Sequence, residues 1–186
     1  MHSLVKLAKN SVETFIKTEQ IISPPDDLPE EFLNRKSGTF VTIESREELR
    51  GCIGTYLPIR QNIAEEVIYN AIAAAKEDYR FGPIQEDEFP DLSYTVYILN
   101  KPELIKNIFQ LNPKEYGIIV RSIPMVEEKD EVTFNGRLAY KAGLLLPDLE
   151  GIDTPEKQVS IACQKARIDP KTEKFLIYRF SAEKYH

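Results

Sequence analysis

The sequence predicts an α+β fold, in which helices pack on mostly antiparallel sheets. Apolar residues recur at helical spacing in three segments and alternate with polar residues in several others. Extended segments follow one another across short polar turns, as β-hairpins do, and hairpin strands are antiparallel. Because helical and extended segments are interspersed, we expect the helices to stack on the sheets.

The chain begins with an amphipathic helix over residues 4–16, with Ser3 placed as its N-terminal cap. The proline-rich segment ISPPDDLPEEF, which follows, predicts an extended connector. Residues 38–45 alternate and are rich in β-branched side chains, which predicts a strand. After a polar turn at residues 46–49, GCIGTY returns as the partner strand of a hairpin.

The clearest helix runs from Asn62 to Asp78, with one apolar face and with Glu65 and Glu66 near its N-terminal end, where the helix dipole favours acids. Residues 92–99 alternate strongly and predict a strand.

The second half predicts a strand at residues 117–123 and a hairpin at 131–143 that turns at Asn135-Gly136. Thr154 and Pro155 begin a helix that extends to about residue 168, and residues 174–185 predict a closing strand. We expect one domain over residues 1–186, or two intimately packed subdomains with a soft boundary near residues 112–116.

Composition excludes several classes of protein. No window approaches the ~18 apolar residues of a membrane span, and the N-terminus lacks the uninterrupted apolar stretch of a secretory signal. Two cysteines are too few for a disulfide framework, so we expect a cytoplasmic protein with reduced thiols. The net charge of −6 disfavours nucleic acid as a partner, because such binding depends on Lys and Arg.

The two histidines, His2 and His186, stand at the two ends of the chain, where fraying is common. The sequence therefore lacks a histidine within the fold that could activate a Ser or Cys nucleophile or bind zinc, and no metal site is predicted. The chain also lacks the glycine patterns of phosphate-binding and dinucleotide-binding loops, so no cofactor is expected.

The motif LRGCIGTY, residues 49–56, is the strongest functional signal. Gly51 and Gly54 stand on either side of Cys52 in a predicted strand, and such glycines mark a bulge or a close approach to the backbone. Their missing side chains would also open space around the sulfur. Arg50, two residues earlier, would project from the same face and favour the thiolate, whereas Thr55 would lie on the opposite face unless a bulge intervenes.

Two interpretations of Cys52 stay open. It is either a reactive thiol or a small buried hydrophobe in a glycine-rich strand. Asp78 and Arg80, in KEDYRFGP, either end a helix in the ordinary way or face a cleft beside the glycine strand and bind a polar or anionic ligand. Cys163, on the apolar face of the last helix, is predicted to be core packing.

Three segments together resemble one family: LRGCIGTY, then AIAAAKEDYRFGP, then GLLLPDLEGIDTPEKQVSIACQKA. The chain is similar over its whole length to the AMMECR family, and most of all to its prokaryotic branch, called AmmeMemoRadiSam system protein A. The resemblance implies a two-lobed α+β fold, with the RGCIG strand near a cleft between the lobes. It also implies an unassigned activity, and association with a Memo-like protein and a radical SAM protein.

Two functional hypotheses follow, and the sequence does not decide between catalysis and docking. In the first, the protein is a component of a modification pathway, and Cys52 is its nucleophile, thiol carrier or modified residue. Its binding residues would then be Arg50, Gly51, Gly54, Thr55, Asp78 and Arg80. In the second, the protein is a non-catalytic module that binds the Memo-like and radical SAM proteins.

Overall fold

The computed structural model describes residues 1–123, 133–134, 137–138 and 141–186. The chain divides into two compact units: unit 1 holds residues 1–100 and 183–186, and unit 2 holds residues 101–182. The first division falls after Asn100, earlier in the chain than the boundary predicted near residues 112–116.

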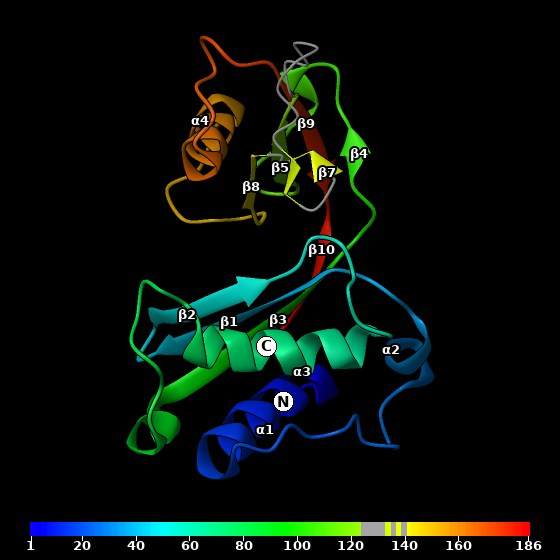
Figure 1. Ribbon diagram of the computed structural model, residues 1–186, viewed down its shortest axis with the longest axis vertical. Coiled ribbons are helices and arrows are strands. Elements are labelled where there is room, and N and C mark those ends of the chain that lie inside the picture. Colours follow the sequence, from blue (N-terminus) through cyan, green and yellow to red (C-terminus); the bar gives the residue numbers. More distant parts are fainter. Residues whose placement is uncertain (124–132, 135–136, 139–140) are drawn as a thin grey trace. The chain divides into compact units, whose positions relative to one another are not determined.

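Unit 1 is a four-stranded antiparallel sheet with two main helices on one face (Figure 1). The order of its strands is β10-β3-β1-β2, so β2 lies at one edge. Its strands are β1 (Thr39–Ser45), β2 (Glu48–Gly54), β3 (Leu92–Leu99) and β10 (Ala182–Tyr185). Its helices are α1 (Ser3–Thr18), α2 (Glu30–Asn34), α3 (Ile63–Lys76) and the 3-10 helix η1 (Glu86–Asp91).

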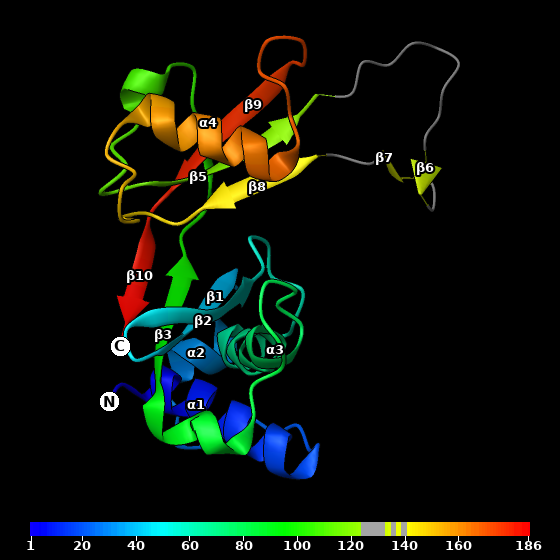
Figure 2. The same cartoon turned by 90° about the vertical axis from the view of Figure 1, so that its left-hand side faces the viewer.

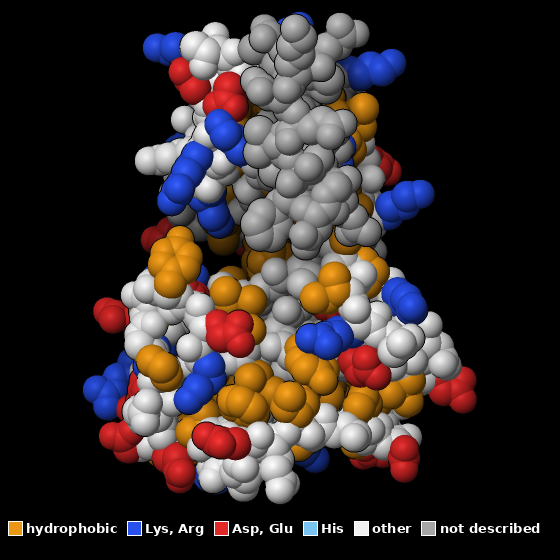
Figure 3. All heavy atoms as spheres, in the orientation of Figure 1, with side chains coloured by type: hydrophobic (Ala, Val, Ile, Leu, Met, Phe, Trp, Pro, Cys, Tyr) orange, Lys and Arg blue, Asp and Glu red, His pale blue; other side chains and the backbone are white. Residues whose placement is uncertain are grey.

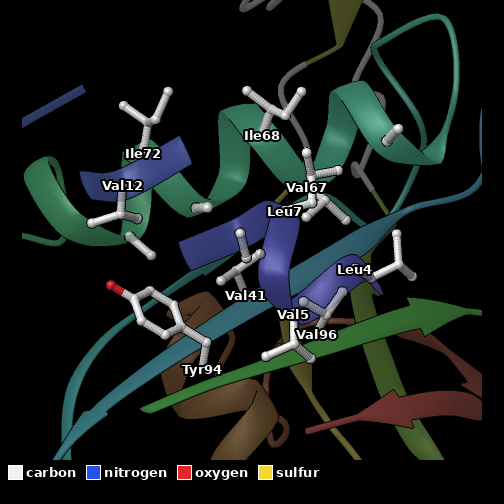
Figure 4. Close-up of a cluster of buried hydrophobic side chains, with 14 of the residues drawn as sticks. Leu4, Val5, Leu7, Val12, Val41, Val67, Ile68, Ile72, Tyr94 and Val96 are labelled. Atoms are coloured by element: carbon white, nitrogen blue, oxygen red, sulfur yellow. The ribbon is translucent and has the colours of Figure 1, made fainter. Parts of the chain in front are cut away.

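The core of unit 1 fills the space between the helices and the sheet (Figure 4). Val41 and Val96 point from the sheet toward the apolar faces of α1 and α3, and both are fully buried. Because side chains alternate along a strand, Thr42 and Thr95 lie on the other face of the sheet, away from these helices. The helical and alternating patterns in the sequence therefore meet in one apolar layer.

The caps of these helices show how local sequence sets the ends. Asn62 caps α3, and its side chain accepts a hydrogen bond from the backbone N–H of Glu65 at 2.9 Å. The cap of α1 is His2 and not Ser3, because the His2 ring accepts from the backbone N–H of Leu4. His2 also stacks on Tyr185 with ring centroids 4.2 Å apart, so the expectation of a frayed His2 is wrong.

Unit 2 is a second four-stranded antiparallel sheet, covered on one face by the helix α4 (Figure 2). The order of its strands is β4-β9-β5-β8. Its elements are β4 (Glu103–Leu104), the 3-10 helix η2 (Ile108–Gln110), β5 (Gly117–Ser122), β8 (Ala142–Leu145), α4 (Pro155–Ala166) and β9 (Phe175–Phe180). Cys163 on α4 is 1% exposed in the core of this unit, as predicted.

A separate two-stranded ladder pairs β6 (Thr133–Phe134) with β7 (Arg137–Leu138). The turn predicted at Asn135-Gly136 lies outside the described residues.

Two of the predicted elements need correction. The closing strand predicted at residues 174–185 is two strands, because β9 ends at Phe180 and belongs to one sheet, while β10 pairs in the other. The connector predicted as extended contains α2, which turns Phe32 into the core, where it is 2% exposed. Tertiary burial of one aromatic side chain here overrides the extended preference of the surrounding prolines.

Both sheets are wholly antiparallel among the described strands, so the predicted α+β class is confirmed. In the described part of the chain, no helix is long and apolar enough to cross a membrane. The face of unit 1 visible in Figure 3 carries apolar side chains interspersed with charged ones of both signs.

Candidate functional site

The two glycines of the RGCIG motif let the backbone of β2 approach its neighbours closely. A Cβ atom on Gly51 would overlap the carbonyl oxygen of Ala74 on α3, and one on Gly54 would overlap that of Thr39 on β1. The prediction of a close backbone approach is therefore confirmed. The prediction that the missing side chain opens space around the sulfur is wrong for Gly51, because that position faces α3, on the other side of the sheet from Cys52.

A β-bulge at Arg50 interrupts the strand just before the glycines. Ile43 pairs with Gly51 and Glu44 with Leu49, which leaves Arg50 without a partner position on β1. The bulge breaks the simple alternation on which the expected position of Arg50 depended.

The guanidinium of Arg50 makes three hydrogen bonds away from the thiol. It donates to both carboxylate oxygens of Glu88 on η1, at 2.7 and 2.9 Å, and to the carbonyl oxygen of Gly82 at 2.8 Å. These bonds lower the pKa of Glu88, with burial opposing them. Arg50 thus links the edge strand to η1, and its partner Glu88 was not among the residues predicted for the site.

The thiol of Cys52 lies on the sheet face away from α1 and α3. Cys52 pairs with Thr42, and the Thr42 hydroxyl donates a hydrogen bond to the sulfur at 3.4 Å. Cys52 is partly exposed, in contrast to the buried Cys163. The thiol is therefore held in one direction and is not sealed in the core.

Asp78 lies just after α3 and binds the free edge of β2. Its carboxylate accepts the backbone N–H of Cys52 at 2.9 Å, and the side chain is only 3% exposed. The N–H of Cys52 points away from β1, so Thr42 and Cys52 form a non-hydrogen-bonded pair, in which the two side chains lie closest together. The same carboxylate that fixes the edge thus also fixes the position of the thiol.

Arg80 completes this arrangement. It donates to both oxygens of Asp78, at 2.9 and 2.6 Å, and to the carbonyl oxygen of Cys52 at 3.5 Å. These bonds from Arg80 lower the pKa of Asp78 to about 2, while burial opposes the shift and the Cys52 N–H assists it. The Asp78 carboxylate raises the pKa of Arg80 against the effect of burial, and negative charge at Cys52 contributes in the same direction.

This mutual effect has a chemical consequence for the cysteine. If a thiolate favours the charged guanidinium, the guanidinium favours the thiolate to the same degree. One of the two interpretations of the sequence had Asp78 and Arg80 beside the glycine strand, and the structure brings both to the backbone of Cys52. The cation beside the thiol, however, is Arg80 and not Arg50.

Thr55 belongs to a different polar cluster, on the helix side of the sheet. Its hydroxyl donates to Glu66 at 2.7 Å, and Asn70 donates to the hydroxyl of Thr39 at 2.9 Å. Glu66 is 1% exposed and also accepts the backbone N–H groups of Ile59 and Arg60. This buried carboxylate holds the loop that follows β2.

The sequence contains a signal for this cluster, which was missed because Glu66 was interpreted only as an acid that favours the N-terminal end of the helix. Glu66 and Asn70 are four residues apart, within the apolar face of α3. A polar pair within an apolar stripe predicts buried hydrogen bonding. Thr55 therefore lies on the face opposite Cys52, as alternation predicts, and its partners are structural.

A groove lies beside Arg50, between the β1–β2 hairpin and η1. It is lined by Ser45, Arg46, Glu48, Leu49, Arg50, Asp87, Glu88 and Asp91, and Cys52 is not part of its wall. In the part of the chain that the structure describes, no three His, Cys, Asp or Glu side chains gather to hold a metal ion. The chemistry available near Cys52 is that of a thiol, a hydroxyl and a carboxylate–guanidinium pair.

Comparison with known proteins identifies the family. The AMMECR1 family model matches residues 5–185, which is nearly the whole chain. The chain belongs to the AMMECR1 family. The chain resembles a protein of Thermotoga maritima, with 42% identity over 185 residues that cover 99% of this chain and 97% of that protein.

Two further relatives of the AMMECR1 family member are informative. The crystal structure of the uncharacterized protein PH0010 from Pyrococcus horikoshii matches with a TM-score of 0.81 and 33% identity, over 97% of this chain and 88% of that one. A protein of Clostridium acetobutylicum is 41% identical over 94% of this chain, but the match covers only 35% of that protein. In that relative, the family domain is part of a longer chain.

Proposed function

We propose that Cys52 is the chemical centre of a cytosolic component of a modification pathway, as a nucleophile, a thiol carrier or the residue that is modified. The proposal depends on one observation: the partly exposed thiol lies in the electrostatic field of Arg80, whose guanidinium is fixed by the buried carboxylate of Asp78. Cysteines that have a cation beside them react as thiolates.

The arrangement needs no histidine to activate the sulfur. The positive charge of Arg80 favours the thiolate, and the Thr42 hydroxyl supplies a hydrogen bond to it. A cysteine in an apolar setting has neither, as at Cys163, where burial raises the pKa of the thiol. The two cysteines of the chain therefore serve as site and matched control.

The partners we propose are a Memo-like protein and a radical SAM protein, as for the AmmeMemoRadiSam branch that the sequence resembles. The Clostridium acetobutylicum relative supports a role beside other protein parts, because most of its length lies outside the family domain.

The rate of alkylation by iodoacetamide tests the proposal. In a Cys163→Ser background, we expect native Cys52 to react at neutral pH, with a rate that reaches its plateau below the range of an ordinary thiol, near 8.5. The Cys52→Ser variant in the Cys163→Ser background gives the blank, and Cys163 in a Cys52→Ser background is the buried comparison. A Cys52 that reacts only after urea unfolds the protein would exclude it as a chemical centre.

A second candidate is a non-catalytic docking module. The loop after β2 exposes Leu57 and Ile59, at 56% and 71%, next to the half-exposed Tyr56. Such apolar side chains on a loop fixed by a buried carboxylate are typical of a protein contact. If replacing Leu57 and Ile59 with Ser abolished co-purification of a Memo-like or radical SAM protein, and Cys52→Ser had no effect in cells, docking would be the function.

A further inference from the structure

The two units share one topology, which makes unit 2 an internal control for the site in unit 1. In each unit, two antiparallel strands are followed by a helix and a third strand, which pairs with the first. The order β3-β1-β2 in unit 1 corresponds to β9-β5-β8 in unit 2, and all these pairs are antiparallel.

The correspondence holds residue by residue at the edge strand. Gly143 on β8 is the counterpart of Gly51, because a Cβ atom there would overlap the carbonyl oxygen of Ala162 on α4. Leu144 follows Gly143 as Cys52 follows Gly51. The carbonyl oxygen of Leu144 accepts a hydrogen bond from Lys165 at 2.9 Å, as that of Cys52 accepts one from Arg80.

Residues at the edge strand of unit 1 that have no counterpart in unit 2 are therefore not required by the shared fold. Across the three strands of unit 1, Cys52 on β2 lies opposite Thr42 on β1, which lies opposite Thr95 on β3. In unit 2, Leu144 on β8 lies opposite Ile119 on β5, which lies opposite Tyr178 on β9. At the edge of unit 2 the ammonium group of Lys165 binds the carbonyl oxygen of Leu144, whereas at the edge of unit 1 a buried carboxylate and a guanidinium bind the backbone of Cys52. The thiol, its hydroxyl partner and the Asp78–Arg80 pair are additions to a shared framework.

Arg80 has hydrogen-bonding capacity left beyond its structural contacts. Its Nε donates to Asp78, and its Nη2 donates to Asp78 and to the carbonyl oxygen of Cys52. The side chain is 43% exposed. Among the residues that the structure describes, none accepts a bond from the other terminal nitrogen, Nη1. The guanidinium, which contacts the backbone of Cys52, therefore has two N–H groups left to donate, and carboxylate and phosphate groups are its natural acceptors.

We propose that the site takes an anionic electrophile, whose carboxylate or phosphate group binds Nη1 of Arg80 while the Cys52 thiolate attacks the neighbouring carbon. The sulfur–carbon bond forms as the bond from that carbon to a leaving group breaks, and the leaving group departs with the electron pair. This inference rests on the proposed role of Cys52 and adds the charge class of its substrate. Asp78 is then a positioning residue, because it holds both the guanidinium and the backbone of Cys52.

Two alkylating agents of nearly equal size test the charge class. Iodoacetate carries a carboxylate and iodoacetamide a neutral amide. In both reactions, the sulfur–carbon bond forms as the carbon–iodine bond breaks, and iodide leaves with the electron pair. We expect the ratio of the iodoacetate rate to the iodoacetamide rate at Cys52, in the Cys163→Ser protein, to be about two- to fivefold higher in the native state than in urea.

Variants assign this preference to Arg80. Arg80→Gln should lower the native ratio to its value in urea, while Arg80→Lys should retain part of the preference. Arg46→Gln removes the same charge from an arginine that is 80% exposed and pairs with Asp91, and should leave the ratio unchanged. If Arg80→Gln does not fold, raising the salt concentration should shrink the preference of the wild-type site.

The outcomes separate this inference from the function on which it rests. Native reaction with iodoacetamide, without any preference for iodoacetate, would overturn the anionic substrate class and leave Cys52 as a reactive thiol. A preference that survives both high salt and Arg80→Gln would also overturn it. No reaction with either reagent before unfolding would overturn the proposed function itself. Protection by acetate or by inorganic phosphate, at equal ionic strength, distinguishes the two anionic groups.

Discussion

At the scale of single residues, Asp78 joins the parts of the site, because its carboxylate binds both the backbone of Cys52 and the guanidinium of Arg80. It accepts the edge N–H of β2, binds Arg80 through both oxygens and is almost completely buried. A buried carboxylate is stable only when such bonds compensate for the lost water. Its ionisation state should therefore be visible in the stability of the whole protein.

We predict that Asp78→Asn lowers the free energy of unfolding at neutral pH by about 2 kcal/mol, because the pKa of Asp78 falls from 3.8 to about 2 on folding. A carboxyl group with a lowered folded-state pKa stabilises the protein above its unfolded pKa. That contribution is lost as the pH falls through the folded pKa. The difference between wild type and variant should therefore be constant above about pH 5 and shrink toward pH 2, as measured by urea unfolding.

The control is Asp91→Asn, which removes an ion pair with the exposed Arg46. Exposed pairs contribute little, so we expect a change within about 0.5 kcal/mol. A gap between wild type and Asp78→Asn that stays constant down to pH 2 would contradict the assigned role.

The sequence predicted much of this site, and its failures have physical causes. Cys52, Asp78 and Arg80 meet, as in one of the two interpretations that the sequence left open, because β2 and the end of α3 bring them together. Arg50 does not join them, because the bulge shifts the strand by one residue, and the glycines indicated a bulge or a close approach without giving the position of a bulge. Glu88 was not predicted because its partnership with Arg50 spans 38 positions of chain.

At the scale of elements, the contact between β2 and α3 depends on Gly51. We predict that Gly51→Ala lowers the free energy of unfolding by about 1–3 kcal/mol, because the new methyl group forces the strand away from the carbonyl oxygen of Ala74. Gly82→Ala is the matched control, since nothing lies within 4 Å of its Cβ position. Urea unfolding of both variants measures the difference, and equal effects would refute the close-packing account.

The elements that patterns predicted correctly are those with strong periodicity. α3, β1 and β3 have largely apolar faces, so local sequence and tertiary packing agree. The long closing strand was predicted as one element because residues 175–180 are β-prone and no Gly or Pro separates them from residues 181–185. The break at Ser181 comes from a change of sheet, which is a property of topology and leaves no composition signal.

At the scale of the whole molecule, the connections between the units are reciprocal. β3 of unit 1 leads directly to β4, which pairs with the third strand of unit 2. β9 of unit 2 leads after one residue to β10, which pairs with the third strand of unit 1. Each sheet is thus completed by a strand that continues the other unit's chain; unit 2 is one continuous stretch of sequence, whereas unit 1 takes its last strand, β10, from the end of the sequence.

This connectivity predicts one cooperative unfolding transition for both units. Loss of β9 from its sheet releases the chain next to β10, where Arg35 binds Glu183 at 2.9 Å and Tyr185 packs against the core of unit 1. We therefore expect Gly51→Ala in unit 1 and Gly143→Ala in unit 2 to shift the same midpoint in scanning calorimetry. For a chain of this size, each kcal/mol should lower the midpoint by about 2–4 °C.

The calorimetric test also has a clear opposite outcome. A single transition, with equal calorimetric and van't Hoff enthalpies in the wild type and both variants, would show that the exchanged strands couple the units. Two resolved transitions, each moved by only one of the two glycine variants, would show that the units unfold separately. In that case β10 would contribute to unit 1 without making its stability depend on unit 2.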